Sequence, residues 1–444
     1  MTDSQLEPAL PELLRQFQHA LNAGHFDLAD RVGEMIAAHE PGNEDVVGFL
    51  VGRAIARRDY PYALRICHAA VQSRSSSARL HFQLGTTLQA TGDREAALAA
   101  FRQARQCDPE LMVAALWQAD QELALGRTDD ALRSQMQALA LAERSGRLAR
   151  GTTLAPPVRE RIEHAVAAVQ AERRSAVNLA LAPLREVHGD IALSRIDRAL
   201  ARLHGESVPG PSNPLQQPTL LWVPDLPDQA WFEREQFPFL RALEQATSEI
   251  RNELLRVLAD DSDFSPYIDM PSNAPAATIF HALNRSSNWS AYHLFRHGER
   301  VEEHCRRCPA TVALLESLPL LRIPEHSPEI LFSLLKPHTH IPPHAGVING
   351  RLTVHLPLIV PHNCGALRAG GEAREWREGE CLIFDDSYLH EAWNDSEQTR
   401  VVLILDVWNP YLSDVEREGL ATAIAAVGRF HRSHGADDIT RESN

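Results

Sequence analysis

The spacing of apolar residues changes along the chain, from a helical period in the first 205 residues to alternation further on. Residues 155–205 place their apolar side chains three or four positions apart, as on one face of a helix. After about residue 275, short apolar runs are bounded by Gly and Pro turns instead, which predicts strands. Four runs carry this pattern: 329–336, 351–360, 376–386 and 399–408. We therefore expect helices first and a sheet domain afterwards.

A small residue recurs every 34 positions in the N-terminal third. The positions are Ala29, Ala63, Ala97 and Ala131. A turn position keeps the same period, as Gly24, Arg58, Gly92 and Gly126. This pattern predicts four helix–turn–helix units over residues 8–145 and resembles tetratricopeptide repeats, an all-α solenoid in which stacked pairs bury one continuous core. An irregular Ala- and Leu-rich bundle would not keep this phase. Such arrays usually bind peptides or proteins, so we expect a protein partner.

A segment rich in Pro, Gly, Ser and Asn, residues 205–218, marks the clearest domain boundary. We read it as a linker. The predicted division is a repeat array at 8–145, a helical extension with the linker at 146–218, and a sheet domain at 219–430. An amphipathic helix is expected early in that last domain, over residues 237–258.

Composition and charge narrow the function classes. The 444 residues are too many for one ordinary core. A net charge of −15 argues against a nucleic-acid partner and against docking on an anionic membrane. The first residues lack the pattern of a signal peptide, no apolar run reaches the length of a membrane span, and six cysteines suit a reducing compartment, so a cytoplasmic protein is expected. Cys305 and Cys308 form one CxxC without a second half, which favours incidental thiols over a zinc site.

The strand at 351–360 has a polar face, formed by Arg351, Thr353 and His355. In a closed barrel this face would line a ligand pocket, and on an open sheet it would face water. Alternation alone does not decide between the two.

Histidines cluster around this strand and suggest a metal site. His338, His340 and His344 precede the strand, and His390 follows 46 residues after His344. A common iron triad is His-x-Asp/Glu with a distant histidine. Here Gly346 stands where the carboxylate would be, so a metal held by His344 and His390 would complete its coordination with water and co-substrate.

The sequence around these histidines resembles that of the aspartyl/asparaginyl β-hydroxylases. The matching segments are FSLLKPHTHIPPHAGVINGRLTVHLPL, Trp376 to Gly379 as W-x-x-G, LIFDDSYLHEAWND and TRVVLILDVWNP. The resemblance covers about residues 220–415 and implies a double-stranded β-helix, a jelly-roll or cupin-like fold. It also implies Fe(II) as cofactor, with 2-oxoglutarate and O₂ as co-substrates. Helical repeats ahead of the oxygenase domain look like the architecture of animal members.

The resemblance implies roles for six residues and no catalytic residue beyond the metal site. His344 and His390 match the iron ligands, in a family where some members have Gly in place of the acid. Arg400, assisted by Ser333, matches the group that binds the distal carboxylate of 2-oxoglutarate, and a guanidinium suits that task because its planar fork grips a carboxylate at two points. His355 matches a contact to the other end of the co-substrate.

The sixth residue, Arg351, matches an arginine near the substrate. The family often carries a second arginine two positions later, where this chain has Thr353, so the substrate class stays open. Without the resemblance, Arg400 would be read as a surface cation. Asp385 and Asp386 are expected to be structural, and His338 and His340 to orient loops.

Three functions follow from these features. The first is an Fe(II)/2-oxoglutarate dioxygenase that hydroxylates an Asp- or Asn-like side chain of a peptide or protein recruited by the repeats. The second is a hydroxylase of a lipid acyl chain, as in related bacterial members. The third is a repeat scaffold whose barrel only binds a ligand. The sequence names neither the target residue, the partner nor the oligomeric state.

Overall fold

The computed structural model describes residues 9–148, 152–259, 264–270 and 278–435. They fall into two compact units, residues 1–169 and 170–444. The three-part division expected from the sequence is a finer partition and stays a prediction. No helix in the described ranges is both long and apolar enough to span a membrane.

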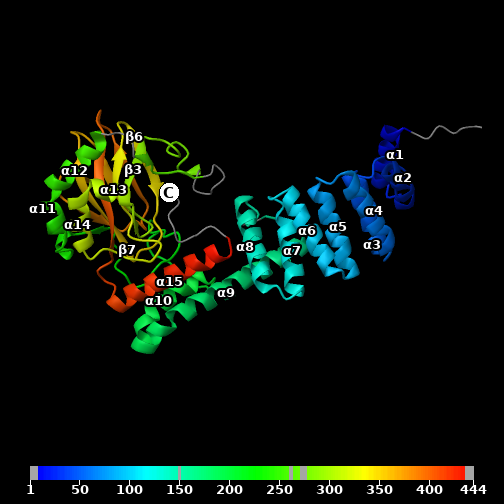
Figure 1. The fold of residues 1–444 in the computed structure, drawn as a ribbon, viewed down its shortest axis with the longest axis horizontal. Coiled ribbons are helices and arrows are strands. Elements are labelled where there is room, and N and C mark those ends of the chain that lie inside the picture. The colour runs from blue at the N-terminus through cyan, green and yellow to red at the C-terminus, as the bar shows by residue number, and fades with distance from the viewer. Residues whose placement is uncertain (1–8, 149–151, 260–263, 271–277, 436–444) are drawn as a thin grey trace, which may run out of the picture. The chain divides into compact units, whose positions relative to one another are not determined.

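The first unit is a row of helix pairs with a strict 34-residue period (Figure 1). The first helices of the pairs are α1 (Leu10–Asn22), α3 (Glu44–Ala56), α5 (Ala78–Thr91) and α7 (Met112–Ala124). The second helices are α2 (Phe26–His39), α4 (Tyr60–Ser73), α6 (Arg94–Cys107) and α8 (Thr128–Arg144). Within each series the starting residues lie 34 positions apart, which confirms the predicted repeat.

The residues that carried the sequence period have the expected structural roles. The four recurring alanines are fully buried. Gly24, Gly92 and Gly126 have positive φ, as the turn requires, and Arg58 adopts the same left-handed conformation with φ 62°. Side chains of Asn43, Asp59, Ser77 and Asp93 cap the following helices by accepting a backbone N–H.

Two helical glycines of this unit give a matched stability prediction. A Cβ at Gly85 would lie 2.5 Å from the Phe101 ring, whereas one at Gly52 meets nothing within 4 Å. We expect Gly85→Ala to destabilise the first unit by about 1–3 kcal/mol through overpacking. Gly52→Ala should instead stabilise it by up to about 1 kcal/mol through helix propensity. Urea unfolding of both variants checks the opposite signs, and the same sign in both would refute the packing assignment.

The second unit has a helical layer and two antiparallel sheets. Helix α9 (Pro156–His188) begins in the first unit and continues into the second. Helices α10 (Asp190–Leu203) and α15 (Asp414–Ser433) lie side by side (Figure 1) and are joined by an ion pair between Arg195 and Glu416 at 2.6 Å. Their close approach uses Gly419, since a Cβ there would collide with Leu193.

The larger sheet has the order β1-β10-β7-β12-β5-β3-β2, with β4 paired to β3. Its strands are β1 (Trp231–Phe232), β2 (Ser265–Pro266), β3 (Trp289–Arg296), β4 (Glu299–Arg300), β5 (Ile330–Leu335), β7 (Arg351–Ile359), β10 (Leu382–Phe384) and β12 (Arg400–Trp408). The smaller sheet has the order β6-β11-β8-β9. Its strands are β6 (Thr339–His344), β8 (Ala366–Ala369), β9 (Glu372–Glu375) and β11 (His390–Asn394). All four predicted strands are present, as β5, β7, β10 and β12.

The two faces of the larger sheet bury different residues. One face packs against four helices that gather at one side of the strands (Figure 1). They are α11 (Leu240–Gln245), α12 (Thr247–Ala259), α13 (Glu302–Arg307) and α14 (Pro309–Ser317). The helix predicted over 237–258 is therefore divided, with α11 ending before Ala246. The other face shares a hydrophobic core with the smaller sheet. The larger sheet contributes Leu335 and Val402 to this core, and the smaller sheet contributes Ile341 and Ala392.

The structure shows whether the polar face of β7 lies inside the domain or faces water, which the alternation of residues did not decide. The polar side chains of β7, namely Arg351, Thr353 and His355, are only 5–7% exposed. They lie on the face opposite the helix-covered apolar residues Leu352 and Val354. The polar face therefore lines the interior of the domain and does not face water.

Part of the predicted linker is not a linker. Residues 215–221 are bound by backbone hydrogen bonds to two segments far along the chain, around Gly346 and around Ser387. The Pro-rich composition correctly indicates irregular backbone, but this stretch is an ordered part of the second unit.

Candidate functional site

The two histidines predicted to hold a metal come together at one end of the smaller sheet. His344 ends β6, His390 begins β11, and the two are directly paired across these antiparallel strands. Their ring centroids are 4.0 Å apart. Strand pairing thus joins two residues that are 46 positions apart in the sequence.

The backbone orients both rings in the same way. Nδ1 of His344 lies 2.8 Å from the Pro342 carbonyl oxygen, and Nδ1 of His390 lies 3.0 Å from that of Tyr388. Because a carbonyl can only accept, Nδ1 of each ring is the donor, which in a neutral imidazole leaves the lone pair on Nε2. Burial lowers the pKa of His390 to about 4, so this imidazole is neutral at neutral pH. A neutral imidazole with a fixed tautomer is what a transition metal binds.

The space beside Gly346, where the ordinary iron triad has its carboxylate, is occupied by the side chain of Asp386. A Cβ at Gly346 would collide with the carboxylate of Asp386, so no acidic side chain fits at 346 while Asp386 keeps its place. The Gly346 N–H also donates to the Asp386 carbonyl at 2.6 Å. The Asp386 carboxylate itself is paired with Arg351. In the described part of the chain, no group of three or more His, Cys, Asp or Glu is arranged to hold a metal ion.

Arg400 is a buried cation for which the described ranges supply no counter-ion. It is 1% exposed, which rules out the surface cation that the sequence alone would suggest. Its Nη1 donates to the Ser333 carbonyl at 3.3 Å, its guanidinium lies 4.6 Å above the Trp376 ring, and its Nε has no partner. No carboxylate of the described residues forms an ion pair with it. Burial lowers the pKa of Arg400 to about 10, and the group remains charged at neutral pH.

An unpaired buried guanidinium costs several kcal/mol unless an anion joins it. Ser333, whose backbone carbonyl accepts from Arg400, has a hydroxyl that accepts a hydrogen bond from Trp289 Nε1 at 3.2 Å, so its own O–H is available to donate elsewhere. This end of the interior is therefore suited to bind a carboxylate.

His355 stands between the arginine and the histidine pair. The Trp376 indole donates to His355 Nδ1 at 3.4 Å. An indole N–H only donates, so His355 carries its proton on Nε2. Burial, and then the charge of Arg400, lowers the pKa of His355 well below its usual value. The rings of His355 and His390 each lie 5.3 Å from the Phe384 ring, so both contact the same aromatic side chain.

Sequence reasoning missed the function of Trp376. The residue entered only as part of a W-x-x-G motif, yet it touches Arg400 with its ring face and His355 with its N–H. The sequence feature that could have indicated this role is a tryptophan within a turn-rich segment. A buried tryptophan needs a partner for its indole N–H, so a polar neighbour is expected.

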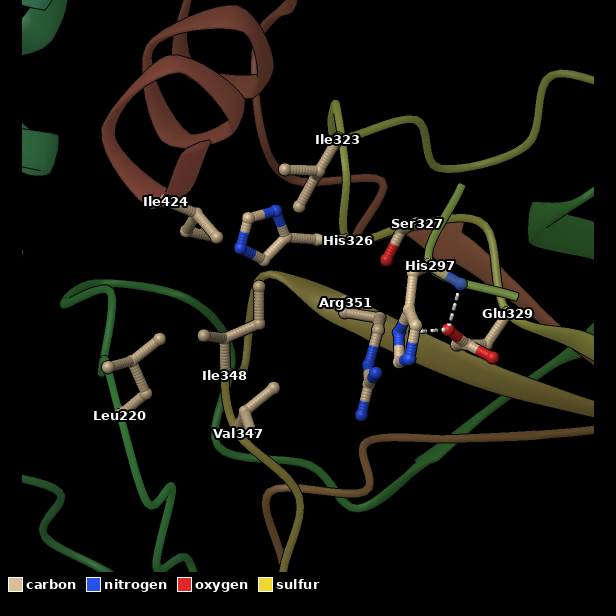
Figure 2. Close-up of a pocket in the computed structure, with 10 residues that line it drawn as sticks. All are labelled: Leu220, His297, Ile323, His326, Ser327, Glu329, Val347, Ile348, Arg351 and Ile424. Carbon is tan, nitrogen blue, oxygen red and sulfur yellow. Dashed lines mark hydrogen bonds and ion pairs between the residues drawn. The ribbon is translucent and has the colours of Figure 1, made fainter. Parts of the chain in front are cut away.

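Arg351 forms ion pairs with two buried carboxylates. It pairs with Asp386 and lies 3.8 Å from Asp406. It also lines a small cavity of about 20 Å³ together with His297 and Glu329 (Figure 2). Ile323, Ile348 and Ile424 form the apolar side of this cavity. The predicted substrate-binding arginine is thus already neutralised within the protein.

The cavity contains a carboxylate whose charge contributes to stability. Burial alone would raise the pKa of Glu329, but contacts with His293 and His297 outweigh it and lower the pKa to about 2. A lowered acidic pKa contributes stability above pH 4.5 that is lost as the pH falls toward 2. We expect Glu329→Gln to cost up to about 3 kcal/mol at pH 6 and progressively less below pH 4.5. Urea unfolding of wild type and variant from pH 6 to 3 tests this, and a pH-independent difference would contradict it.

The remaining candidates lie away from the histidine pair. His338 and His340 are on the surface, where they pair with Glu397 at 3.2 Å and Glu391 at 2.7 Å. All six cysteines are free, and Cys305 and Cys308 are buried in the core. Burial raises the pKa of Cys308 to about 12, so this thiol is unreactive.

Comparison with known proteins agrees with this geometry. Residues 244–410 match the family model described as aspartyl/asparaginyl beta-hydroxylase. The human protein named aspartyl/asparaginyl beta-hydroxylase is 38% identical over 138 residues, which cover 31% of this chain and 18% of that protein. Ornithine lipid ester-linked acyl 2-hydroxylase of Rhizobium tropici is 34% identical, covering 41% and 61%. Aspartate beta-hydroxylase domain-containing protein 2 of Xenopus tropicalis is 33% identical, covering 48% and 56%.

The chain therefore spans less than two thirds of the length of each of these relatives. Among solved structures, a crystal structure of MamA covers 35% of this chain and 90% of its own at 18% identity, with a TM-score of 0.28. The family match includes all six candidate site residues, and the paired histidines and the buried arginine lie inside it. Residues 244–410 of this chain form an aspartyl/asparaginyl β-hydroxylase domain.

Proposed function

We propose that the second unit is an Fe(II)- and 2-oxoglutarate-dependent dioxygenase with a double-stranded β-helix fold, and that it hydroxylates a side chain of a peptide or protein. The observation that carries the proposal is the pairing of two oriented imidazoles with a buried, uncompensated guanidinium in one interior. A metal held by two neutral imidazoles has coordination positions open for a chelating co-substrate. The buried positive charge of Arg400 would be neutralised by an anionic group of that co-substrate.

The residues fit this cofactor in type and orientation. His344 and His390 would hold iron through their Nε2 atoms, since Nδ1 of each is bound to a carbonyl. Bound iron supplies the activation of O₂, which couples oxidative decarboxylation of 2-oxoglutarate to succinate and CO₂ with insertion of one oxygen atom into a substrate C–H bond. Because Asp386 leaves no room for an acidic side chain at 346, the two imidazoles would leave the remaining coordination positions to co-substrate and water.

The protein's own contribution is to anchor the co-substrate and exclude water. Arg400 would bind the distal carboxylate of 2-oxoglutarate, with the Ser333 hydroxyl as a second donor. His355 would donate from Nε2 to the other end of the same molecule. Trp289 and Trp376, both buried, would keep this end dry, which strengthens the charged hydrogen bonds.

The substrate assignment is drawn from the relatives' names, with an Asp- or Asn-like side chain as first choice. The helical repeats would recruit the substrate protein or a partner. A lipid acyl chain is the second candidate, because the relative from Rhizobium tropici is matched over a larger share of its length than the human protein.

The test is succinate formation from 2-oxoglutarate with Fe(II) and O₂, measured with peptides containing Asp or Asn and with ornithine lipid in detergent. Product mass spectrometry should find one added oxygen atom on the peptide, and none with His344→Ala. Hydroxylation of the lipid alone would select the second candidate. No succinate with any substrate, in protein that has bound iron, would favour a ligand-binding scaffold instead.

A further inference from the structure

A segment outside the matched region touches both loops that carry the paired histidines. We call residues 215–223 the strap. It precedes the first residue of the family match, 244, by more than twenty positions. Trp222 and Val223 at its end lead toward β1, and Leu220 faces the same small cavity as Val347 and Ile348 (Figure 2).

One half of the strap binds the segment that leads to His390. The Gln217 N–H donates to the Ser387 carbonyl at 2.7 Å, and the Leu389 N–H donates back to the Leu215 carbonyl at 2.7 Å. Leu389 is the residue directly before His390. The backbone on which this ring depends is therefore paired with the strap on both sides of Tyr388.

The other half binds the loop that follows His344. The Thr219 N–H donates to the Gly346 carbonyl at 3.1 Å, and the Leu220 N–H donates to the Val347 carbonyl at 3.0 Å. Asn349 forms two hydrogen bonds with the backbone of Val223. Its side-chain oxygen accepts from the Val223 N–H at 2.7 Å, and its side-chain N–H donates to the Val223 carbonyl at 2.9 Å. One short segment thus ties together the two loops beside the paired rings.

Gln216 is the side chain at the centre of this connection. It is 8% exposed, and its Nε2 donates to Asp385 Oδ2 at 3.1 Å and to the Ser387 hydroxyl at 3.3 Å. Its Oε1 accepts from Trp222 Nε1 at 3.2 Å. Asp385 and Ser387 are themselves buried, and besides this amide Asp385 accepts from the Ser387 N–H at 2.9 Å. The neighbouring Gln217 side chain is exposed, and its amide donates to the Pro214 carbonyl of the strap's own neighbourhood rather than to the 385–389 turn.

We propose that the strap is an integral part of the oxygenase site and that Gln216 is a positioning residue, which holds the 385–389 turn so that the His390 ring meets that of His344. The inference rests on the proposed function. A site with two protein ligands has no third ligand to correct a misplaced ring, so the supporting hydrogen bonds decide its geometry.

The test compares Gln216→Ala and Gln216→Glu with Gln217→Ala in the full chain. Glutamate keeps the shape and the acceptor of residue 216, removes the two N–H donors and places a second carboxyl against Asp385, so it breaks this contact without a loss of packing volume. We expect both Gln216 variants to weaken metal binding by about 10–100-fold and Gln217→Ala to leave it unchanged. Co(II), titrated in place of iron and followed by visible absorption, reports binding without turnover.

Amide hydrogen exchange supplies a second readout. In the Gln216 variants, exchange should quicken in residues 345–349 and 385–390 and stay unchanged in β7 and β12, with melting temperatures near that of wild type. Gln216→Glu with wild-type Co(II) affinity and exchange would overturn the strap's role, even if the protein melts earlier. Wild-type protein that binds no Co(II) would contradict the proposed function itself.

Discussion

Replacing Arg400 with methionine is expected to abolish 2-oxoglutarate turnover and, at the same time, to make the second unit more stable. The guanidinium is buried, its Nε is unpartnered and no carboxylate neutralises it. Apolar replacements of buried charged groups are often neutral or stabilising by about 1–4 kcal/mol. We expect a gain near the lower end, because the contact with the Trp376 ring is also lost. Urea unfolding and succinate assays measure the two effects separately.

A lysine at the same position is the matched control. Arg400→Lys keeps the charge but presents a single ammonium instead of a planar fork, so the KM for 2-oxoglutarate should rise while some turnover remains. If Arg400→Met instead destabilises the unit by several kcal/mol and leaves the KM unchanged, the arginine is a structural group and the carboxylate site lies elsewhere.

Removing either paired histidine is expected to have the other large effect. His344→Ala and His390→Ala each leave one imidazole, and the loss of metal affinity should exceed the roughly 100-fold that removal of a supporting residue costs. Because both rings depend on backbone carbonyls for orientation, the two variants should behave alike. Co(II) titration and iron content after purification give the measurement.

His340→Ala is the control for this pair. Its ring is on the surface and is paired with Glu391, so metal affinity and turnover should remain at the wild-type level. Equal losses in His340→Ala and His390→Ala would mean that the metal lies outside the paired rings, at the other end of β6.

Periodicity predicted the repeat array well because every unit obeys the same packing constraint. The alanines at 34-residue intervals are buried, and even the exception at Arg58 keeps the backbone conformation of the glycines it replaces. A solenoid contacts mainly its nearest neighbours, so a local pattern carries nearly all the information.

The strap is a segment whose structure local sequence patterns did not predict. Its first residues, 215–218, end the segment 205–218, whose Pro, Gly, Ser and Asn content predicted a linker. Composition reports the absence of regular structure and not the absence of order. The hydrogen bonds of Gln217 and Thr219 reach residues more than 120 positions away, and no local pattern announces such partners.

The site was partly predictable for a similar reason. The replacement of a carboxylate by Gly346 was visible in the sequence, but the packing of Asp386 into that place was not. Likewise, the position of Arg400 on a strand does not reveal its burial or its missing counter-ion. Sequence motifs identified the residue types, and the three-dimensional structure adds which charges are paired.

The most direct test of the central claim is an anaerobic titration of 2-oxoglutarate into Fe(II)-loaded protein, followed by visible absorption. A keto-acid that chelates iron produces a charge-transfer band. We predict that this band saturates at one 2-oxoglutarate per chain, is absent in His390→Ala, and requires far more ligand in Arg400→Met. No band in wild-type protein at saturating 2-oxoglutarate, or an identical titration in all three proteins, would contradict the account.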